Sequence, residues 1–221
     1  MWCVPILDNA YIRNMEDLLR LYAKPLSAKE PVVCLDEKPV QLHDSKRSGH
    51  VASDGTRRRD YEYRRRGTAN LFVCVEPRAG RHIVKATQTR DRFEFARMLR
   101  DIARRYPRAT VIHLVVDNLS THSKKAVFDA FGAEKAKKLW ARFSIHYTPK
   151  HGSWLNQAEI AISLVSRECL AKRRFGTLDR LEAETRAWSI AATKAKRTIN
   201  WKFRIPDARK KFSYSRPRSC G

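Results

Sequence analysis

Residues 148–170 read TPKHGSWLNQAEIAISLVSRECL, and this stretch places the acid Glu159 between apolar neighbours. Apolar side chains recur there at the spacing of an amphipathic helix, which predicts a long helix across the stretch. Asn156 lies one turn before Glu159 and Ser163 one turn after it, so the three residues share a helix face. A glutamate near a helix N-terminus is commonly explained by the helix dipole. Whether Glu159 also has a chemical role depends on the rest of the chain.

The composition is that of a globular protein with a strong positive charge. The chain has 221 residues, of which 43% are hydrophobic, and this favours one folded domain. Its 46 Lys and Arg against 23 Asp and Glu give a net charge of +23. Such a balance indicates nucleic acid as partner, with an anionic membrane surface as the competing explanation. We find no apolar run of about 18 residues and no signal peptide, so we expect a cytoplasmic protein without a membrane partner.

The order of the expected elements indicates an α/β fold. Three β-rich segments, followed by alternating helices and strands, favour a mixed sheet flanked by helices over a wholly parallel one. In chain order, we predict a helix at 9–24, a strand at 31–40 that ends near Asp36, a loop or hairpin arm at 46–67, a hairpin at 70–88, a helix at 89–107, a strand at 110–118 that ends at Asp117, a helix at 124–143, a strand at 144–149, the long helix of the opening stretch and a helix at 177–195.

Three carboxylates stand out by their positions. Asp36 and Asp117 end predicted strands, and Glu159 lies on the helix that follows. An acid at a strand end often does no more than cap a turn. If the three converge, two carboxylates about 4 Å apart repel by about 4 kcal/mol at an effective dielectric near 20, so they either become protonated or bind cations. Oxygen ligands suit Mg²⁺ or Mn²⁺, and two such ions support phosphodiester transfer.

Three segments carry a family resemblance. VVCLDEKPVQL contains Asp36, LVVDNLSTH contains Asp117, and YTPKHGSWLNQAEIAISLVSREC contains Glu159. Together they resemble the DDE transposases, specifically bacterial insertion-sequence members of the mariner-like superfamily, over about residues 1–212. The resemblance implies an RNase H-like fold in which Asp36, Asp117 and Glu159 hold two Mg²⁺ or Mn²⁺ ions. It also implies an enzyme that hydrolyses double-stranded DNA at the ends of an element and uses the freed 3′-hydroxyl to attack target DNA, without a covalent enzyme–DNA intermediate.

The resemblance also predicts how the chain is organised. We expect an N-terminal helix at 1–30, the DDE catalytic domain at 31–200 and a loosely held basic tail at 201–221. Family members usually begin with paired helix-turn-helix modules, whereas this sequence starts almost at the catalytic domain. The chain is then a separate frame, a truncated copy or a remnant, and a separately encoded part is one source of end recognition. The resemblance also implies a homodimer that is associated with the bacterial nucleoid. Two alternatives stay open: an inactive or regulatory DNA-binding fragment, and a plain RNase H-type nuclease.

Basic residues mark the expected DNA contacts. Arginines frame Tyr61 and Tyr63 in a segment that directly follows the strand of Asp36, a pattern suited to phosphates with interleaved aromatic rings. Lys150 and His151 lie just before the helix of Glu159, where they face the expected site. The expected contacts from the arginine segment are Arg57, Arg58, Arg59, Arg64, Arg65 and Arg66.

Four further side chains lie near the expected site. Asn156 either bonds a metal-bound water or fixes the start of the helix. Trp154 either stacks on a flipped base or anchors the helix to the core, and packing is the safer reading. His122 either orients a carboxylate or contacts DNA, unless it is an ordinary capping or surface histidine. Glu37 adjoins Asp36, but successive strand residues face opposite ways, so only one of the two is expected to face the metals.

Overall fold

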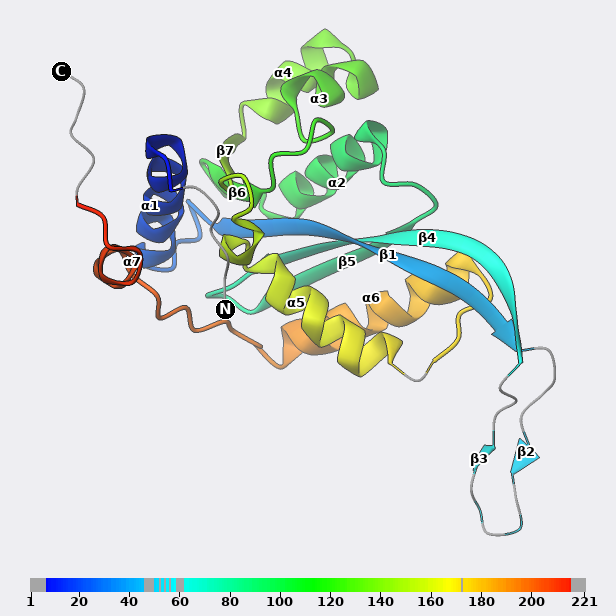
Figure 1. The fold of residues 1–221 in the computed structure, drawn as a ribbon. Helices are drawn as coiled ribbons and strands as arrows, with labels where there is room; N and C mark the ends of the chain where they lie inside the picture. Colours follow the sequence, from blue (N-terminus) through cyan, green and yellow to red (C-terminus); the bar gives the residue numbers. More distant parts are fainter. Residues whose placement is uncertain are drawn as a thin grey trace.

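The computed structural model describes residues 7–45, 50–51, 53, 55, 57–58, 62–171 and 173–215, and its centre is a mixed β-sheet with helices on both faces (Figure 1). The strands of the described part are β1 (Val32–Ser45), β2 (His50–Val51), β3 (Arg57–Arg58), β4 (Tyr63–Glu76), β5 (Arg81–Thr87), β6 (Ile112–Val116) and β7 (Phe143–Tyr147). The helices are α1 (Asn9–Ala23), α2 (Arg92–Arg105), α3 (Lys124–Phe131), α4 (Ala133–Trp140), α5 (Ala158–Val165), α6 (Leu178–Lys194) and α7 (Ile205–Phe212), with short turns η1 (Ser153–Leu155) and η2 (Ser166–Leu170).

The main sheet combines antiparallel and parallel pairing, as the sequence predicted. In the described residues it has five strands in the order β5-β4-β1-β6-β7. β5, β4 and β1 pair antiparallel, whereas β6 runs parallel to both β1 and β7. The hairpin expected at 70–88 is confirmed, because the turn between β4 and β5 spans Pro77–Gly80. The expectation of an α/β fold with helices flanking a mixed sheet is likewise confirmed.

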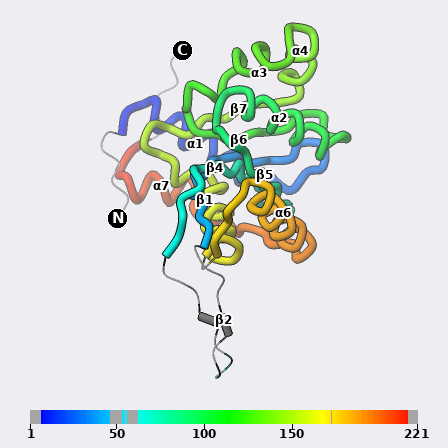
Figure 2. Tube along the Cα trace, turned by 90° about the vertical axis from the view of Figure 1, so that its right-hand side faces the viewer, coloured from blue at the N-terminus to red at the C-terminus, as the bar shows by residue number. Residues whose placement is uncertain are grey.

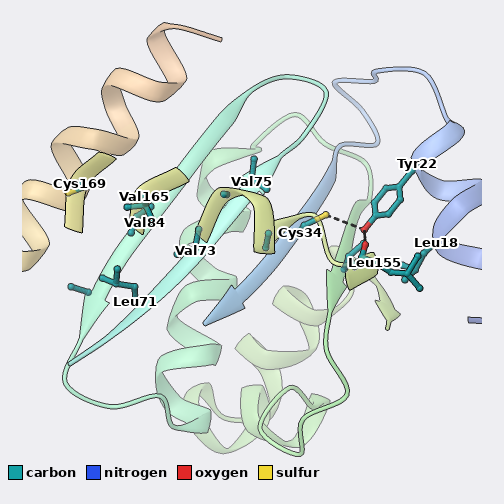
Figure 3. Close-up of a cluster of buried hydrophobic side chains, with 14 of the residues drawn as sticks. Leu18, Tyr22, Cys34, Leu71, Val73, Val75, Val84, Leu155, Val165 and Cys169 are labelled. Atoms are coloured by element: carbon teal, nitrogen blue, oxygen red, sulfur yellow. Dashed lines mark hydrogen bonds between the residues drawn. The ribbon is translucent and has the colours of Figure 1, made fainter. Parts of the chain in front are cut away.

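Each face of the sheet has its own hydrophobic core. Because strand residues alternate between faces, Leu71 and Val73 of β4 point to one side and Phe72 and Cys74 to the other. The first side packs against α1, α5 and α6, and Figure 3 shows part of this cluster around Cys34 and Val73. The second side packs against α2, α3 and α4. The strands are buried on both faces, which explains their continuous apolar runs.

β1 is longer than the sequence predicted. We expected it to end near Asp36, but it runs to Ser45 because β4 pairs with it over that whole length. Pro39 is tolerated inside the strand, since among the described strands β6 pairs with β1 only at Val32–Cys34 and leaves the opposite edge of β1 without a partner at Pro39. Figure 1 shows β1 and β4 curving away together, with β2 and β3 beyond their ends, and Figure 2 shows β2 in the same place. The predicted hairpin arm is therefore partly an extension of the main sheet.

Two other boundaries differ from the prediction. The helix expected at 124–143 is two helices, α3 and α4, because Gly132 takes a left-handed backbone conformation (φ 74°) between them. The long helix of the opening stretch is also interrupted, since Trp154 belongs to the 3₁₀ turn η1 and α5 begins only at Ala158. None of the helices in the described ranges is long and apolar enough to cross a membrane.

The C-terminal region is packed rather than loose as far as residue 215. Helix α7 lies beside α1 in both views (Figures 1 and 2), and its Ala208 is fully buried. The contact is closed by Glu16 of α1, which is 2% exposed and accepts hydrogen bonds from Arg209 at 2.8 and 3.0 Å and from Tyr214 at 3.3 Å. The sequence did not predict this helix because its pairing partner lies almost 200 residues away.

Glu76 at the end of β4 provides a test of the folded core. Its carboxylate is 3% exposed, Tyr106 donates to it at 3.0 Å, and burial raises the pKa of Glu76. A raised folded-state pKa means that Glu76 contributes most to stability below its ordinary pKa and that this contribution is lost as the pH rises through the folded pKa. We therefore expect the melting temperature of Glu76→Gln, relative to that of the wild type, to rise between about pH 4 and pH 7. Thermal unfolding across this range measures the gain.

The control for this test is Glu134→Gln, because Glu134 is exposed on α4 and pairs with Lys138. We expect its melting temperature to follow the wild type at every pH. If the melting temperature of Glu76→Gln instead falls relative to that of the wild type as the pH rises, the ion pair between Glu76 and Arg81, at 3.4 Å, outweighs burial. The assignment of a raised pKa to Glu76 is then wrong.

Candidate active site

Two neighbouring parallel strands bring Asp36 and Asp117 together. The register pairs Cys34 of β1 with Val115 of β6, and each aspartate lies two residues further along its own strand direction. They therefore follow the pairing at the same end of the sheet, on the same face. Glu159 is the second residue of α5, which packs over β1 and β4. Residues far apart in the sequence thus lie near one another at the end of the sheet where β6 ends.

The charges of Glu159 and Asp117 act on Asp36. Burial raises the pKa of Asp36 to about 7, and the nearby charges of Glu159 and Asp117 add to this effect. A hydrogen bond of 2.8 Å from the backbone N–H of Glu37 opposes it. At neutral pH the site therefore resists a full complement of negative charge. Such a cluster is relieved either by a proton or by a cation.

Asn156 joins the strand of Asp36 to the helix of Glu159. Its Nδ2 donates to the carbonyl of Leu35 at 2.9 Å and to Asp36 Oδ2 at 3.3 Å, while its Oδ1 accepts from the N–H of Ala158 at 3.1 Å. The side chain is 1% exposed. Asn156 thus precedes the helix rather than lying on it, and it caps the first turn. This geometry matches the reading in which it fixes the helix start, with an added contact to an acid of the site.

The segment before α5 is held by α1. Trp154 donates from Nε1 to the hydroxyl of Tyr11 at 3.2 Å, and its ring meets that of Phe203 at a centroid distance of 5.6 Å. Tyr22 donates to the carbonyl of Leu155 at 2.7 Å, a contact drawn in Figure 3. The structure therefore places Trp154 in core packing, the safer of the two readings.

His122 is fully buried beside two carboxylates. Its Nε2 lies 2.8 Å from Glu37 Oε1, and its Nδ1 lies 2.6 Å from Asp117 Oδ1. The hydrogen bond of Nδ1–H is directed at the Asp117 carbonyl, at 3.3 Å, so the closer Oδ1 contributes an ion pair. Burial by itself lowers the pKa of His122, but Asp117 and Glu37 outweigh it and raise the pKa to about 9. Among its readings, the geometry favours the one that orients a carboxylate.

Glu37 is the residue whose part in the site the sequence reasoning missed. It faces away from Asp36, as expected, but its side chain is only 4% exposed and contacts His122. A sequence signal existed: an acid inside a buried strand needs a partner, and LVVDNLSTH supplies a histidine after the neighbouring strand. Recognising the pair required knowing that β1 and β6 are neighbours.

The predicted DNA contacts are only partly described. Arg64, Arg65 and Arg66 are exposed on β4, where Arg66 pairs with Asp44 at 3.2 Å. The backbones of Arg57 and Arg58 form β3, whereas Arg59 and Tyr61 lie outside the described residues. The ring of Tyr63 is 43% exposed, and the guanidinium of Arg174 lies over it at 5.6 Å.

The turn before η1 contains the other predicted DNA contacts. Lys150 and His151 are both exposed there, and His151 has a left-handed backbone conformation (φ 61°). A role for either residue in binding DNA stays a prediction.

The donor set fits a hard divalent cation. All three acids offer oxygen ligands, and burial together with the charges of Glu159 and Asp117 raises the pKa of Asp36. In the part of the chain that the structure describes, no three His, Cys, Asp or Glu side chains yet stand close enough to hold a metal ion. Binding of a metal ion would therefore have to bring the three acids closer together.

Comparisons with known proteins match the part of the chain that contains these residues. The model of a family described as DDE superfamily endonuclease matches residues 31–182, a range that contains all three acids. No curated protein matched the chain. The solved structures that are similar to it include the Mos1 mariner paired-end complex with Mn, with a TM-score of 0.54 and 17% identity over 86% of this chain and 58% of that one.

Two further structures give the same result. The mariner Mos1 paired-end complex with Mg has a TM-score of 0.55 and 17% identity over 89% of this chain and 62% of that one. The Mos1 strand transfer complex has a TM-score of 0.56 and 18% identity over 86% of this chain and 57% of that one. The chain thus spans less than two thirds of the length of these relatives. The likeness confirms the expected RNase H-like fold.

Proposed function

This chain belongs to the DDE superfamily of endonucleases, and we propose that it is a transposase catalytic domain, which cuts DNA at the ends of a mobile element and joins the cut end to target DNA. The observation that carries the proposal is the convergence of Asp36, Asp117 and Glu159 at one edge of the sheet. The structural likeness to Mos1 complexes supports it.

We propose that Asp36, Asp117 and Glu159 hold two Mg²⁺ or Mn²⁺ ions. Their oxygen-only chemistry supports this, as do the Mos1 complexes with Mn and with Mg. When bound, two divalent ions activate an attacking oxygen and stabilise a leaving one in phosphodiester transfer. The protein contributes orientation: Asn156 holds Asp36 to the start of α5, and His122 contacts Asp117 from the other side.

The partner we propose is double-stranded DNA, both at the element ends and at the target. The net charge of +23 and the exposed arginines of β4 support this. The Mos1 structures are paired-end and strand transfer complexes, which favours a homodimer here. We further propose that the element is a bacterial insertion sequence, that a separately encoded part supplies end recognition, and that the protein acts at the nucleoid.

The proposal is tested by nicking of a supercoiled plasmid with Mg²⁺, with Mn²⁺ and with EDTA. We expect relaxed plasmid only in the two divalent reactions, because the acids are inactive without cations. A protein that binds the plasmid but never nicks it is instead the inactive or regulatory DNA-binding fragment. Nicking confined to RNA–DNA hybrids points to the RNase H-type nuclease.

Replacing Arg64, Arg65 and Arg66 together by Ala tests whether the exposed first part of β4 contacts DNA. Each phosphate neutralised contributes about −0.9 to the slope of log K against log salt, so we expect the slope to flatten by about 3 units. Fluorescence anisotropy of duplex DNA across a salt series measures it.

The matched control removes three exposed lysines of α4, Lys135, Lys137 and Lys138, which changes the net charge equally. We expect its slope to stay near that of the wild type. Equal slopes for the two triple variants mean that the three arginines act only through net charge. The start of β4 then makes no specific contact with DNA.

A further inference from the structure

The pair of Glu37 and His122 stands behind the acid cluster and connects to it. Glu37 follows Asp36 on β1 and points to the opposite face of the sheet, where its side chain is 4% exposed. The ring of His122 is wholly buried there and lies over Phe95 of α2 at a centroid distance of 4.5 Å. Neither side chain opens toward the surface at which Asp117 is accessible.

Hydrogen bonds hold both the backbone and the ring of His122 in place. The backbone N–H of His122 donates to the carbonyl of Leu119 at 3.0 Å, and the backbone carbonyl of His122 accepts from the hydroxyl of Tyr147 at 2.9 Å. Glu37 Oε1 then lies 2.8 Å from Nε2, which leaves Nδ1 turned to Asp117. A buried carboxylate without a partner is costly, so Glu37 stabilises this single ring orientation.

The contact with Asp117 distinguishes this cluster from an ordinary buried ion pair. Glu37 contacts Nε2 of His122, and the backbone carbonyl of Asp117 already accepts from Nδ1. Yet Asp117 Oδ1 lies 2.6 Å from Nδ1, although the Asp117 side chain is 28% exposed and has access to water. With Oδ1 held by His122, Oδ2 of Asp117 is left to bind a cation.

We propose that Glu37 and His122 are positioning residues of the active site: Glu37 orients the ring of His122, and His122 holds the Asp117 carboxylate in a fixed rotamer toward Asp36 and Glu159. This inference rests on the proposed metal-dependent function. Neither residue touches the reacting atoms. Supporting side chains of this kind typically change metal affinity or activity about 10- to 100-fold when they are replaced.

The test uses Glu37→Gln, His122→Gln and the double variant of the full chain. Mn²⁺ binding is titrated by electron paramagnetic resonance without DNA, so the readout does not depend on turnover. We expect each single variant to bind Mn²⁺ at least about tenfold more weakly. The double variant should be no weaker than the weaker single one, since both residues act through Asp117. DNA affinity in EDTA should be unchanged in all three.

Glu134→Gln is the matched control, because it makes the same chemical change at an exposed residue of α4. A second readout needs no metal: in nitrogen NMR of the wild type and of Glu37→Gln, the substitution should alter the Nε2 signal of His122, because Glu37 lies 2.8 Å from that nitrogen. If His122→Gln does not fold, the isosteric Glu37→Gln variant carries the test by both readouts.

The outcomes separate this inference from the proposed function. Folded single variants that bind Mn²⁺ as the wild type does overturn the positioning role and leave the proposed function intact. Effects of the two substitutions that multiply in the double variant also overturn it, since Glu37 then does not act through His122. A wild type that binds no Mn²⁺ overturns the proposed function and the positioning role with it.

Discussion

Asp117→Asn is expected to abolish divalent-dependent nicking while the protein still binds DNA. The amide has the shape of the carboxylate but lacks its charge, so the acid cluster loses one of its three anionic ligands. Loss of one member of a catalytic unit costs roughly as much as loss of the whole, and we expect a fall of at least about a thousandfold. DNA affinity should be equal or slightly higher, since a negative charge near the backbone is removed. Plasmid nicking and duplex anisotropy measure the two effects.

Asp129→Asn is the control for this substitution, because Asp129 lies on α3 and pairs with Lys125 away from the acid cluster. We expect it to nick as the wild type does. Nicking by Asp117→Asn at the wild-type rate would show that the cleavage comes from elsewhere, and the assignment of the three acids would then be abandoned.

Asn156→Ala is expected to weaken both the fold and the activity. The substitution removes the donors to Leu35 and Asp36 and the cap of α5. Leaving such buried groups without partners costs about 1–3 kcal/mol in the free energy of unfolding. Because Asp36 and Glu159 then lose their shared support, we expect nicking to fall about 10- to 100-fold. Urea unfolding and plasmid nicking below the unfolding transition measure the two losses.

The comparison variant is Asn200→Ala, since Asn200 is exposed in the segment before α7. We expect it to match the wild type in both measurements. An Asn156→Ala protein that loses stability but nicks normally would mean that the contact with Asp36 has no part in the reaction, and that Asn156 is only a helix cap.

Local sequence patterns determined the secondary elements where neighbours within one turn or one strand decide the outcome. The hairpin of β4 and β5 and the helix α2 were predicted because turn residues and periodicity act over a few positions. Local patterns did not predict that β1 extends to Ser45, because the length of β1 depends on its pairing with β4. They also failed at Gly132, where a single backbone conformation divides one apparent helix into two.

The site shows the same division. The sequence by itself determined the strong positive charge, the family resemblance and the choice of the three acids as candidates, because composition and a long motif are visible in one dimension. Only the tertiary structure decided that β1 lies beside β6, that Asn156 joins Asp36 to α5, and that Glu37 reaches Asp117 through His122. These contacts join residues about 80 to 120 positions apart, and such pairings depend on how whole elements pack and not on the patterns within them.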